Sequence, residues 1–124
     1  MRHFQTQEFL CRCGCGQGLE HMDQELLDKL EEARQRAGIP FVLTSAFRCE
    51  AHNRAVGGVD DSAHTKGMAV DIRCRDSRSR FVMLRALMGA GFHRIELAPT
   101  WLHVDVDTDK TPDVAFYQPG GVYR

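Results

Sequence analysis

Two short segments of the chain alternate apolar and polar residues, which is the pattern of β-strands with one buried face. In residues 68–73, the alternation directs Asp71 to one face and its aliphatic neighbours to the other. In residues 101–106, His103 and Asp105 share one face, opposite a leucine and two valines. If the two strands belong to one sheet, Asp71 and His103 point to the same surface.

A second histidine, His64, lies in a turn-rich stretch seven positions before Asp71. Together with His103 they offer two imidazoles and one carboxylate, a normal ligand set for a catalytic zinc ion that keeps its fourth position for water. A structural zinc ion more often has four ligands, most of them thiolates. Taken singly, the three residues are better explained as a loop histidine, a solvated strand residue and a half-buried aromatic, because lone histidines and aspartates are common on half-exposed faces.

Three blocks of sequence, in order, carry a resemblance to a known family. They are Ser45–Arg48, His52–Gly58, and the pattern Ser62, His64, Gly67, Ala69, Asp71 followed by His103 in a Leu-His-Val-Asp strand. Over residues 41–107 the chain resembles the zinc D-Ala-D-Ala carboxypeptidase and L-alanyl-D-glutamate endopeptidase family, in its small single-domain form. That family cleaves peptidoglycan peptides. The resemblance implies one catalytic Zn²⁺ bound by His64, Asp71 and His103.

The order of predicted elements indicates a single small α+β domain, with helices packed on one side of a mainly antiparallel sheet and the metal in a groove on the other. The resembled family has this architecture and shares it with the hedgehog signalling domain. We divide residues 1–124 into a Cys-rich N-terminal cap (1–22), a metal-site core (41–107) and a C-terminal tail (108–124). In the tail, only Val114–Tyr117 is expected to form a short strand.

Two helices should cover the sheet. The first follows an N-cap at Asp23 and ends at Gly38. Its apolar stripe is Leu26, Leu27, Leu30 and Ala33. The second runs from about Ser77 to Gly89, with an expected apolar face of Phe81, Leu84, Leu87 and Met88. A third, short helix is expected from Glu50 to about Val56.

Arg48 follows a buried strand predicted in residues 41–45. Its guanidinium could stabilise an oxyanion or grip a substrate carboxylate, or it could pair at the surface with Glu50 or Asp60. The resemblance assigns the matching arginine the first of these roles. Ser62 could hydrogen-bond the substrate or support a ligand, although serine in a loop is usually part of a turn.

A catalytic base should also lie near the metal. Residues 92–97 are expected to pair with residues 101–106 in a hairpin, and strand parity then places Glu96 on the face of His103. We therefore assign Glu96 as the first candidate for the base. Asp105 is the second candidate, since it shares that face but could equally orient a ligand.

The chain departs from the resembled family at the usual place of the base. Many relatives carry an acidic residue three positions before the last histidine ligand, and some carry a histidine two positions before it. This sequence has Thr100 and Trp101 there. The departure leaves a second class of function open, a non-catalytic module that binds metal and cell-wall peptides.

The chain contains five cysteines: Cys11, Cys13, Cys15, Cys49 and Cys74. An odd number argues against a complete disulfide framework and suits a reducing compartment. The first three could bind a second, structural ion if Cys49, Cys74 or a histidine such as His21 completed the shell. The two-residue gaps typical of zinc knuckles are missing, so we expect a reduced, turn-rich cap instead.

Composition excludes several other classes of function. The net charge is −1 and no basic patch is interleaved with aromatics, so we expect no nucleic-acid partner. We find no long apolar run and no secretory signal. We expect a monomer that does not insert into membranes, is made in the cytoplasm and acts on the cell wall.

The predicted function is that of a zinc peptidase hydrolysing peptidoglycan stem peptides, as a carboxypeptidase or an endopeptidase. The compact chain suits a phage endolysin or virion-associated peptidase, or a bacterial homologue. A structural virion protein of the same fold, with the metal only holding the fold, is the remaining alternative. The scissile bond could be D-Ala-D-Ala, L-Ala-D-Glu or a crossbridge.

Overall fold

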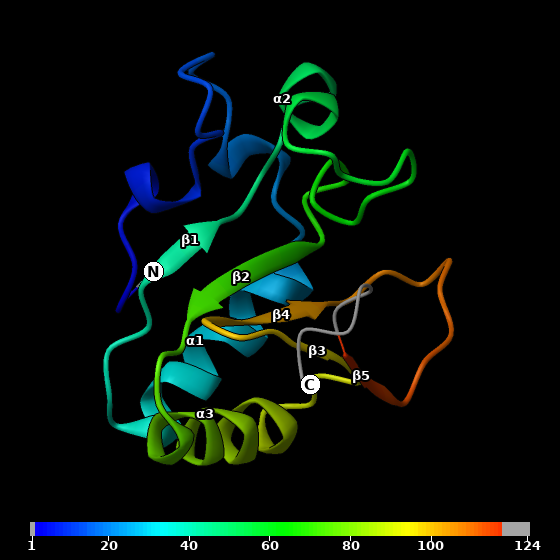
Figure 1. Cartoon of the computed structure of the whole chain (residues 1–124). Helices are drawn as coiled ribbons and strands as arrows, with labels where there is room; N and C mark the ends of the chain where they lie inside the picture. Colours follow the sequence, from blue (N-terminus) through cyan, green and yellow to red (C-terminus); the bar gives the residue numbers. More distant parts are fainter. Residues whose placement is uncertain (1, 118–124) are drawn as a thin grey trace.

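The computed structural model describes residues 2–117, which form an α+β fold (Figure 1). The elements are, in chain order, η1 (Thr6–Phe9), η2 (Leu19–His21), α1 (Gln24–Ala37), β1 (Leu43–Ser45), α2 (Glu50–Ala55), β2 (Ala69–Arg73), α3 (Ser77–Gly89), β3 (Arg94–Leu97), β4 (Trp101–Asp105) and β5 (Val114–Tyr117). Both η elements are 3₁₀-helices. None of the helices in this part of the chain is long and apolar enough to cross a membrane.

The first helix has the ends that its sequence predicts. The Asp23 carboxylate accepts a hydrogen bond from the backbone N–H of Leu26 at 3.1 Å, which caps α1. Gly38 follows the last turn in the left-handed conformation, with φ at 67°. The predicted stripe of three leucines and Ala33 is buried, so this helix is confirmed in its bounds and in its core face.

The last helix, α3, is confirmed in its bounds but only in part in its buried face, where Leu87 is buried and Leu84 is partly buried, as expected. Asp76 caps it by accepting a hydrogen bond from the N–H of Ser79 at 2.8 Å. Phe81 and Met88 were expected in the core, yet their exposed fractions are 64% and 65%. The buried residues are Met83, Ala86 and Leu87. The contact with α1 selects this stripe, while the exposed Phe81 ring lies against the guanidinium of Arg85.

The five strands form one sheet in the order β1-β2-β4-β3-β5. Its pairings are antiparallel except for the parallel pair of β3 and β5. Figure 1 shows α1 and α3 side by side along the sheet, with α2 apart from them beyond β1. Val70, Ile72, Leu102 and Val104 are fully buried in the core cluster that also contains the α1 leucines. The predicted mainly antiparallel α+β domain is confirmed.

The register of the three central strands decides which polar residues meet. His103 on β4 lies opposite Asp71 on β2 and opposite Glu96 on β3. Residues directly opposite each other project to the same face of a sheet. The three side chains therefore form one row across the sheet, as the parity of the strands predicted.

The chain ends also pack as expected where they are described. Phe4 and Phe9 of the N-terminal cap are buried and meet edge to face, with ring centroids 6.0 Å apart. The predicted strand at Val114–Tyr117 is present as β5. The rest of the predicted tail, from residue 118, lies outside the described residues.

Candidate metal centre

His64, Asp71 and His103 converge at one point of the sheet. The Oδ1 atom of Asp71 lies 3.2 Å from Nε2 of His64 and 3.0 Å from Nδ1 of His103. The three ligand atoms lie within 4.8 Å of one another. His64 and Asp71 are buried and His103 is half-buried. The structure thus brings together the three residues that the sequence predicted as metal ligands.

His64 reaches this point from the loop before β2. Gly67 in this loop has a φ of 69°, and its Cα faces the backbone carbonyl of His21 so closely that a side chain would overlap it. The Gly67 carbonyl accepts a hydrogen bond from the N–H of Asp23 at 2.8 Å. These contacts hold the loop against the start of α1, and the loop holds His64 over β2.

Each histidine is oriented by an oxygen on the side away from Asp71. Nδ1 of His64 lies 2.8 Å from the carbonyl oxygen of Ala46, and Nε2 of His103 lies 2.8 Å from Oδ2 of Asp105. A histidine that donates one ring N–H in this way presents its other nitrogen as a ligand. The two free nitrogens face Asp71, so the residues fit a zinc ion that binds two imidazoles and one carboxylate.

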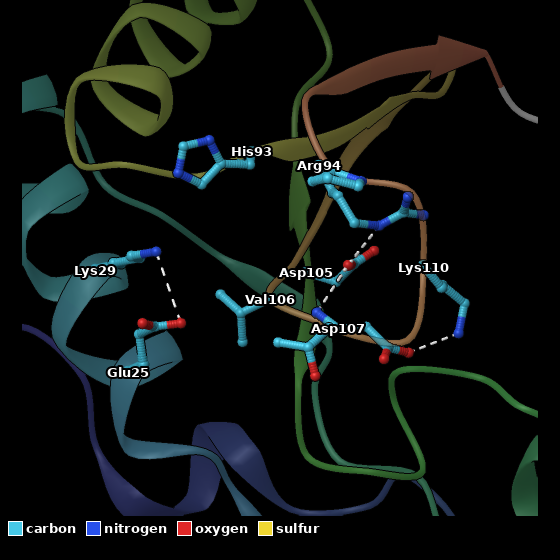
Figure 2. Close-up of a pocket in the computed structure, with 10 residues that line it drawn as sticks. Glu25, Lys29, His93, Arg94, Asp105, Val106, Asp107 and Lys110 are labelled. Carbon is cyan, nitrogen blue, oxygen red and sulfur yellow. Dashed lines mark hydrogen bonds and ion pairs between the residues drawn. The ribbon is translucent and has the colours of Figure 1, made fainter.

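Asp105 is itself held from the other side. Its Oδ1 accepts a hydrogen bond from Nε of Arg94 at 2.8 Å and another from the backbone N–H of Asp107 at 3.2 Å (Figure 2). The residue is only 2% exposed. Both oxygens are therefore engaged, one with His103 and the other with Arg94 and Asp107. This geometry suits a residue that positions a ligand.

A cavity of about 410 Å³ lies behind Asp105 and contains none of the three candidate ligands in its lining. Figure 2 shows that ion pairs line it, among them Arg94 with Asp105 and Lys110 with Asp107. It is bounded on another side by Glu25 and Lys29 of α1. This cavity is therefore separate from the three candidate metal ligands.

The three candidate ligands are one carboxylate, Asp71, in hydrogen-bond contact with two imidazoles, His64 and His103. Burial by itself would raise the pKa of Asp71, but the hydrogen bonds with His103 and His64 hold this pKa well below its usual range. Burial would lower the pKa of His103, but its hydrogen bonds to Asp105 and Asp71 raise it to about 9. A metal ion would displace the proton that these groups share, because only a neutral histidine binds metal.

Arg48 lies beside the ligands and not in the surface pairs with Glu50 or Asp60 considered from the sequence. Its Nη2 is 3.6 Å from Oδ2 of Asp71. The other nitrogens are fixed by neighbours: Nε donates to Oγ of Ser45 and Nη1 to Oδ1 of Asn53, both at 3.2 Å. The guanidinium is thus held at the edge of the site with a fixed orientation.

Glu96 stands next to His103 on the neighbouring strand, half-buried. Burial raises the pKa of its carboxyl group, as do the charges of Asp71 and Asp105, while His103 opposes them. No hydrogen bond to its carboxylate is present among residues 2–117. Its carboxylate is therefore not committed to a structural contact within the described chain, in contrast to that of Asp105.

Ser62 is buried and supports the histidine loop. Its hydroxyl oxygen accepts a hydrogen bond from the backbone N–H of His64 at 3.2 Å, and its carbonyl accepts one from the Thr65 hydroxyl at 2.7 Å.

Two residues that support the site had no role assigned from the sequence. Asn53 is 3% exposed and links Arg48 to the carbonyl of Val59, to which its side chain donates at 2.8 Å. It belongs to a block that carried the family resemblance, which was the available signal. Arg94 lies directly opposite Asp105 in the β3–β4 hairpin, so the register of the predicted hairpin was the signal that could have found this contact.

The structure also decides which residue joins the cysteines of the N-terminal cap. Cys49 lies with Cys11, Cys13 and Cys15, all four sulfur atoms within 4.8 Å of one another. The other two candidates lie elsewhere: Cys74 contacts the carbonyl of Asp76, and His21 stacks on Phe47.

Fold and site together define a small α+β domain with a group of two histidines and an aspartate that could hold one metal ion. The family model for peptidase M15 matches residues 2–105. The chain therefore belongs to the peptidase M15 family, of the zinc D-Ala-D-Ala carboxypeptidase type, as the resemblance indicated. This is a family of metallopeptidases. No curated protein matches the chain.

Proposed function

We propose that this protein is a zinc peptidase that hydrolyses peptide bonds in peptidoglycan stem peptides. The observation that carries the proposal is the row of Asp71, His103 and Glu96 across three strands, with His64 above it. Together these residues provide a set of three metal ligands and the carboxylate of Glu96, which has no hydrogen-bond partner among the described residues. Membership of the M15 family supports both the metal and the reaction class.

The protein's own residues have separable tasks in this proposal. A zinc ion bound by His64, Asp71 and His103 would polarise the scissile carbonyl and lower the pKa of a water molecule. Glu96 takes the proton of the attacking water and returns it to the leaving amine, a role suited to a half-buried carboxylate. Arg48 stabilises the oxyanion or holds a substrate carboxylate, since its guanidinium is already oriented.

Two further residues support these groups. Asp105 holds His103 in the tautomer that leaves Nδ1 free, and is our second candidate for the proton shuttle. Ser62 supports the His64 loop and can offer its hydroxyl proton to substrate. We place the action of the enzyme at the cell wall, as a monomeric phage-type endolysin, virion-associated peptidase or bacterial homologue.

A second candidate function is a metal-dependent module that binds cell-wall peptides without cleaving them. It is favoured by Thr100, which occupies the place where many M15 relatives carry an acidic residue. The two functions share the ligand set and differ in turnover. A third alternative, a structural protein in which the metal only holds the fold, would bind zinc but no peptide.

Three measurements on the purified protein separate these functions: zinc content, binding of purified muropeptides, and mass spectrometry of the products. A peptidase releases products whose masses identify the cleaved bond. His103→Ala should lose the site's zinc and all cleavage. Binding without products would favour the module, and unchanged zinc content in His103→Ala would reject the ligand set.

A further inference from the structure

Four cysteines from two distant parts of the chain meet at the edge of the N-terminal cap. Cys11, Cys13 and Cys15 come from the loop after η1, and Cys49 comes from the residue before α2, 38 positions after Cys11. The sulfur of Cys11 lies 3.4 Å from that of Cys13 and 3.8 Å from that of Cys49. The sulfurs of Cys13 and Cys49 are 3.6 Å apart.

These separations are those of ligands around one ion. Four thiolates at the usual Zn–S distance of about 2.3 Å occupy the corners of a tetrahedron with edges of roughly 3.8 Å. A disulfide would require a separation of about 2.05 Å, and all four cysteines are free thiols. Three of the sulfur atoms, those of Cys11, Cys13 and Cys49, therefore have the spacing of a tetrahedral S₄ set, and the sulfur of Cys15 lies within 4.8 Å of each of them. In proteins an S₄ set holds zinc or iron.

The backbone of the loop is shaped to turn its sulfur atoms inward. The loop is closed by a hydrogen bond from the N–H of Cys11 to the carbonyl of Gln17 at 2.8 Å. Glycine alternates with cysteine, and Gly14 and Gly16 both have a φ of 84°, a left-handed conformation that other residues rarely adopt. Gly14 lies between Cys13 and Cys15, and the reversal there allows these two side chains to face the same point, whereas Arg12 separates Cys11 from Cys13.

Hydrogen-bond donors also surround the sulfur atoms. The backbone N–H of Cys49 points to the sulfur of Cys11, and the N–H of His52 to the sulfur of Cys49, both at 3.4 Å. The side-chain amide of Gln17 lies 3.6 Å from the sulfur of Cys15. Donors to sulfur are typical of metal-bound thiolates, whose charge they stabilise.

We propose that Cys11, Cys13, Cys15 and Cys49 bind a second zinc ion with a structural role. Four thiolates complete the tetrahedral shell and leave no position for water or substrate. The ion would cross-link the N-terminal cap to the segment around Cys49, which follows Arg48 directly in the sequence. A structural metal ion would stabilise a domain of this size, because its single hydrophobic core is small.

The decisive measurement is the zinc content and zinc environment of three variants. Cys13 and Cys15 are exposed, so Cys13→Ala/Cys15→Ala removes two sulfurs without emptying the core. We expect two zinc ions per chain in the parent protein, one in this double variant, and one in His103→Ala. Cys74→Ala is the matched control, because Cys74 lies outside the cluster, and it should retain two.

X-ray absorption at the zinc edge identifies which ion remains. The zinc kept by His103→Ala should have only sulfur neighbours, at about 2.3 Å, and the zinc kept by the double cysteine variant only nitrogen and oxygen neighbours. The parent protein alone already decides the matter if the double variant does not fold. A single zinc without sulfur neighbours, iron in the sulfur site, or a disulfide among the four cysteines in protein purified under reducing conditions would overturn the proposal. None of these readouts depends on peptidase activity.

Discussion

At the scale of single residues, the contacts in the site distinguish Glu96 from Asp105, the two carboxylates that strand parity alone left as candidates for the general base. Asp105 is fully buried, with its oxygens engaged by His103, Arg94 and a backbone N–H. Glu96 lies on the same face without such contacts in the described chain. A group that moves protons must be able to change partners, whereas a group that orients a ligand must not.

We expect Glu96→Gln to keep its zinc and lose hydrolysis by roughly a hundredfold to ten-thousandfold, as on removal of a general base. Asp105→Asn should instead weaken zinc binding by roughly ten- to a hundredfold, because His103 loses its orienting acceptor. Muropeptide turnover and zinc competition with a chelator, measured on both variants, test the assignment. Parent-rate hydrolysis by Glu96→Gln, with inert but zinc-loaded Asp105→Asn, would reverse the two roles.

Arg48 depends on the shape of its side chain as well as on its charge. Its Nε, Nη1 and Nη2 atoms each face a different neighbour, and a lysine ammonium cannot reproduce that planar fork. Arg48→Lys should retain zinc and fold but lose turnover by roughly a hundred- to a thousandfold. Arg54→Lys, on the exposed side of α2, is the matched control. Equal turnover of the two variants would remove Arg48 from the catalytic groups.

At the scale of elements, the loop between α2 and β2 determines whether His64 reaches the sheet. Gly67 combines a left-handed backbone with a close approach to the carbonyl of His21. Gly57, in the turn after α2, shares the left-handed backbone with a φ of 75°, but has open space where a side chain would be. The two glycines therefore separate backbone strain from overlap.

Gly57→Ala should lower the free energy of unfolding by about 1 kcal/mol, the usual cost of a left-handed alanine. Gly67→Ala should cost clearly more and should also weaken zinc binding, because the loop must shift and carries His64 with it. Thermal or denaturant unfolding and zinc titration of both variants provide the comparison. Equal losses with unchanged zinc affinity would show that the contact with His21 does not position the ligand.

At the scale of the whole molecule, one buried carboxylate joins the loops around the site. Asp107 is 3% exposed and accepts hydrogen bonds from Lys66 at 2.9 Å and Lys110 at 2.6 Å. Lys110 also donates to the carbonyl of Asp61 at 2.7 Å. The histidine loop, the end of β4 and the following loop are thus tied at a single point.

This tie should make stability depend on pH in the acid range. Burial opposes ionisation of Asp107, but the two lysines outweigh it and lower the pKa from 3.8 to about 2. In this range the unfolded state binds more protons, so the stabilisation is present above about pH 4 and is lost as the pH falls toward 2. Between pH 4 and pH 2, the free energy of unfolding of the parent protein should fall by about 2 kcal/mol more than that of Asp107→Asn. Denaturant unfolding of both proteins at several pH values tests this prediction. The same dependence of unfolding free energy on pH in the two proteins would contradict it.

The sequence by itself determined the features that depend on local periodicity. Alternation in two short segments placed Asp71 and His103 on one face, and the hairpin added Glu96 to it. The caps at Asp23 and Gly38 set the bounds of α1. These features follow from the geometry of strands and helix ends, which the nearest few residues determine, and the family resemblance rested on the same segments.

Only the tertiary structure decided which distant groups meet. It brought Cys49 to the cysteines of the cap and turned Phe81 and Met88 of α3 to solvent. Local sequence marks an apolar or reactive residue but not the element that will face it. Contacts between distant residues depend on how helices, loops and strands pack in the folded chain, and that packing is a property of the whole fold.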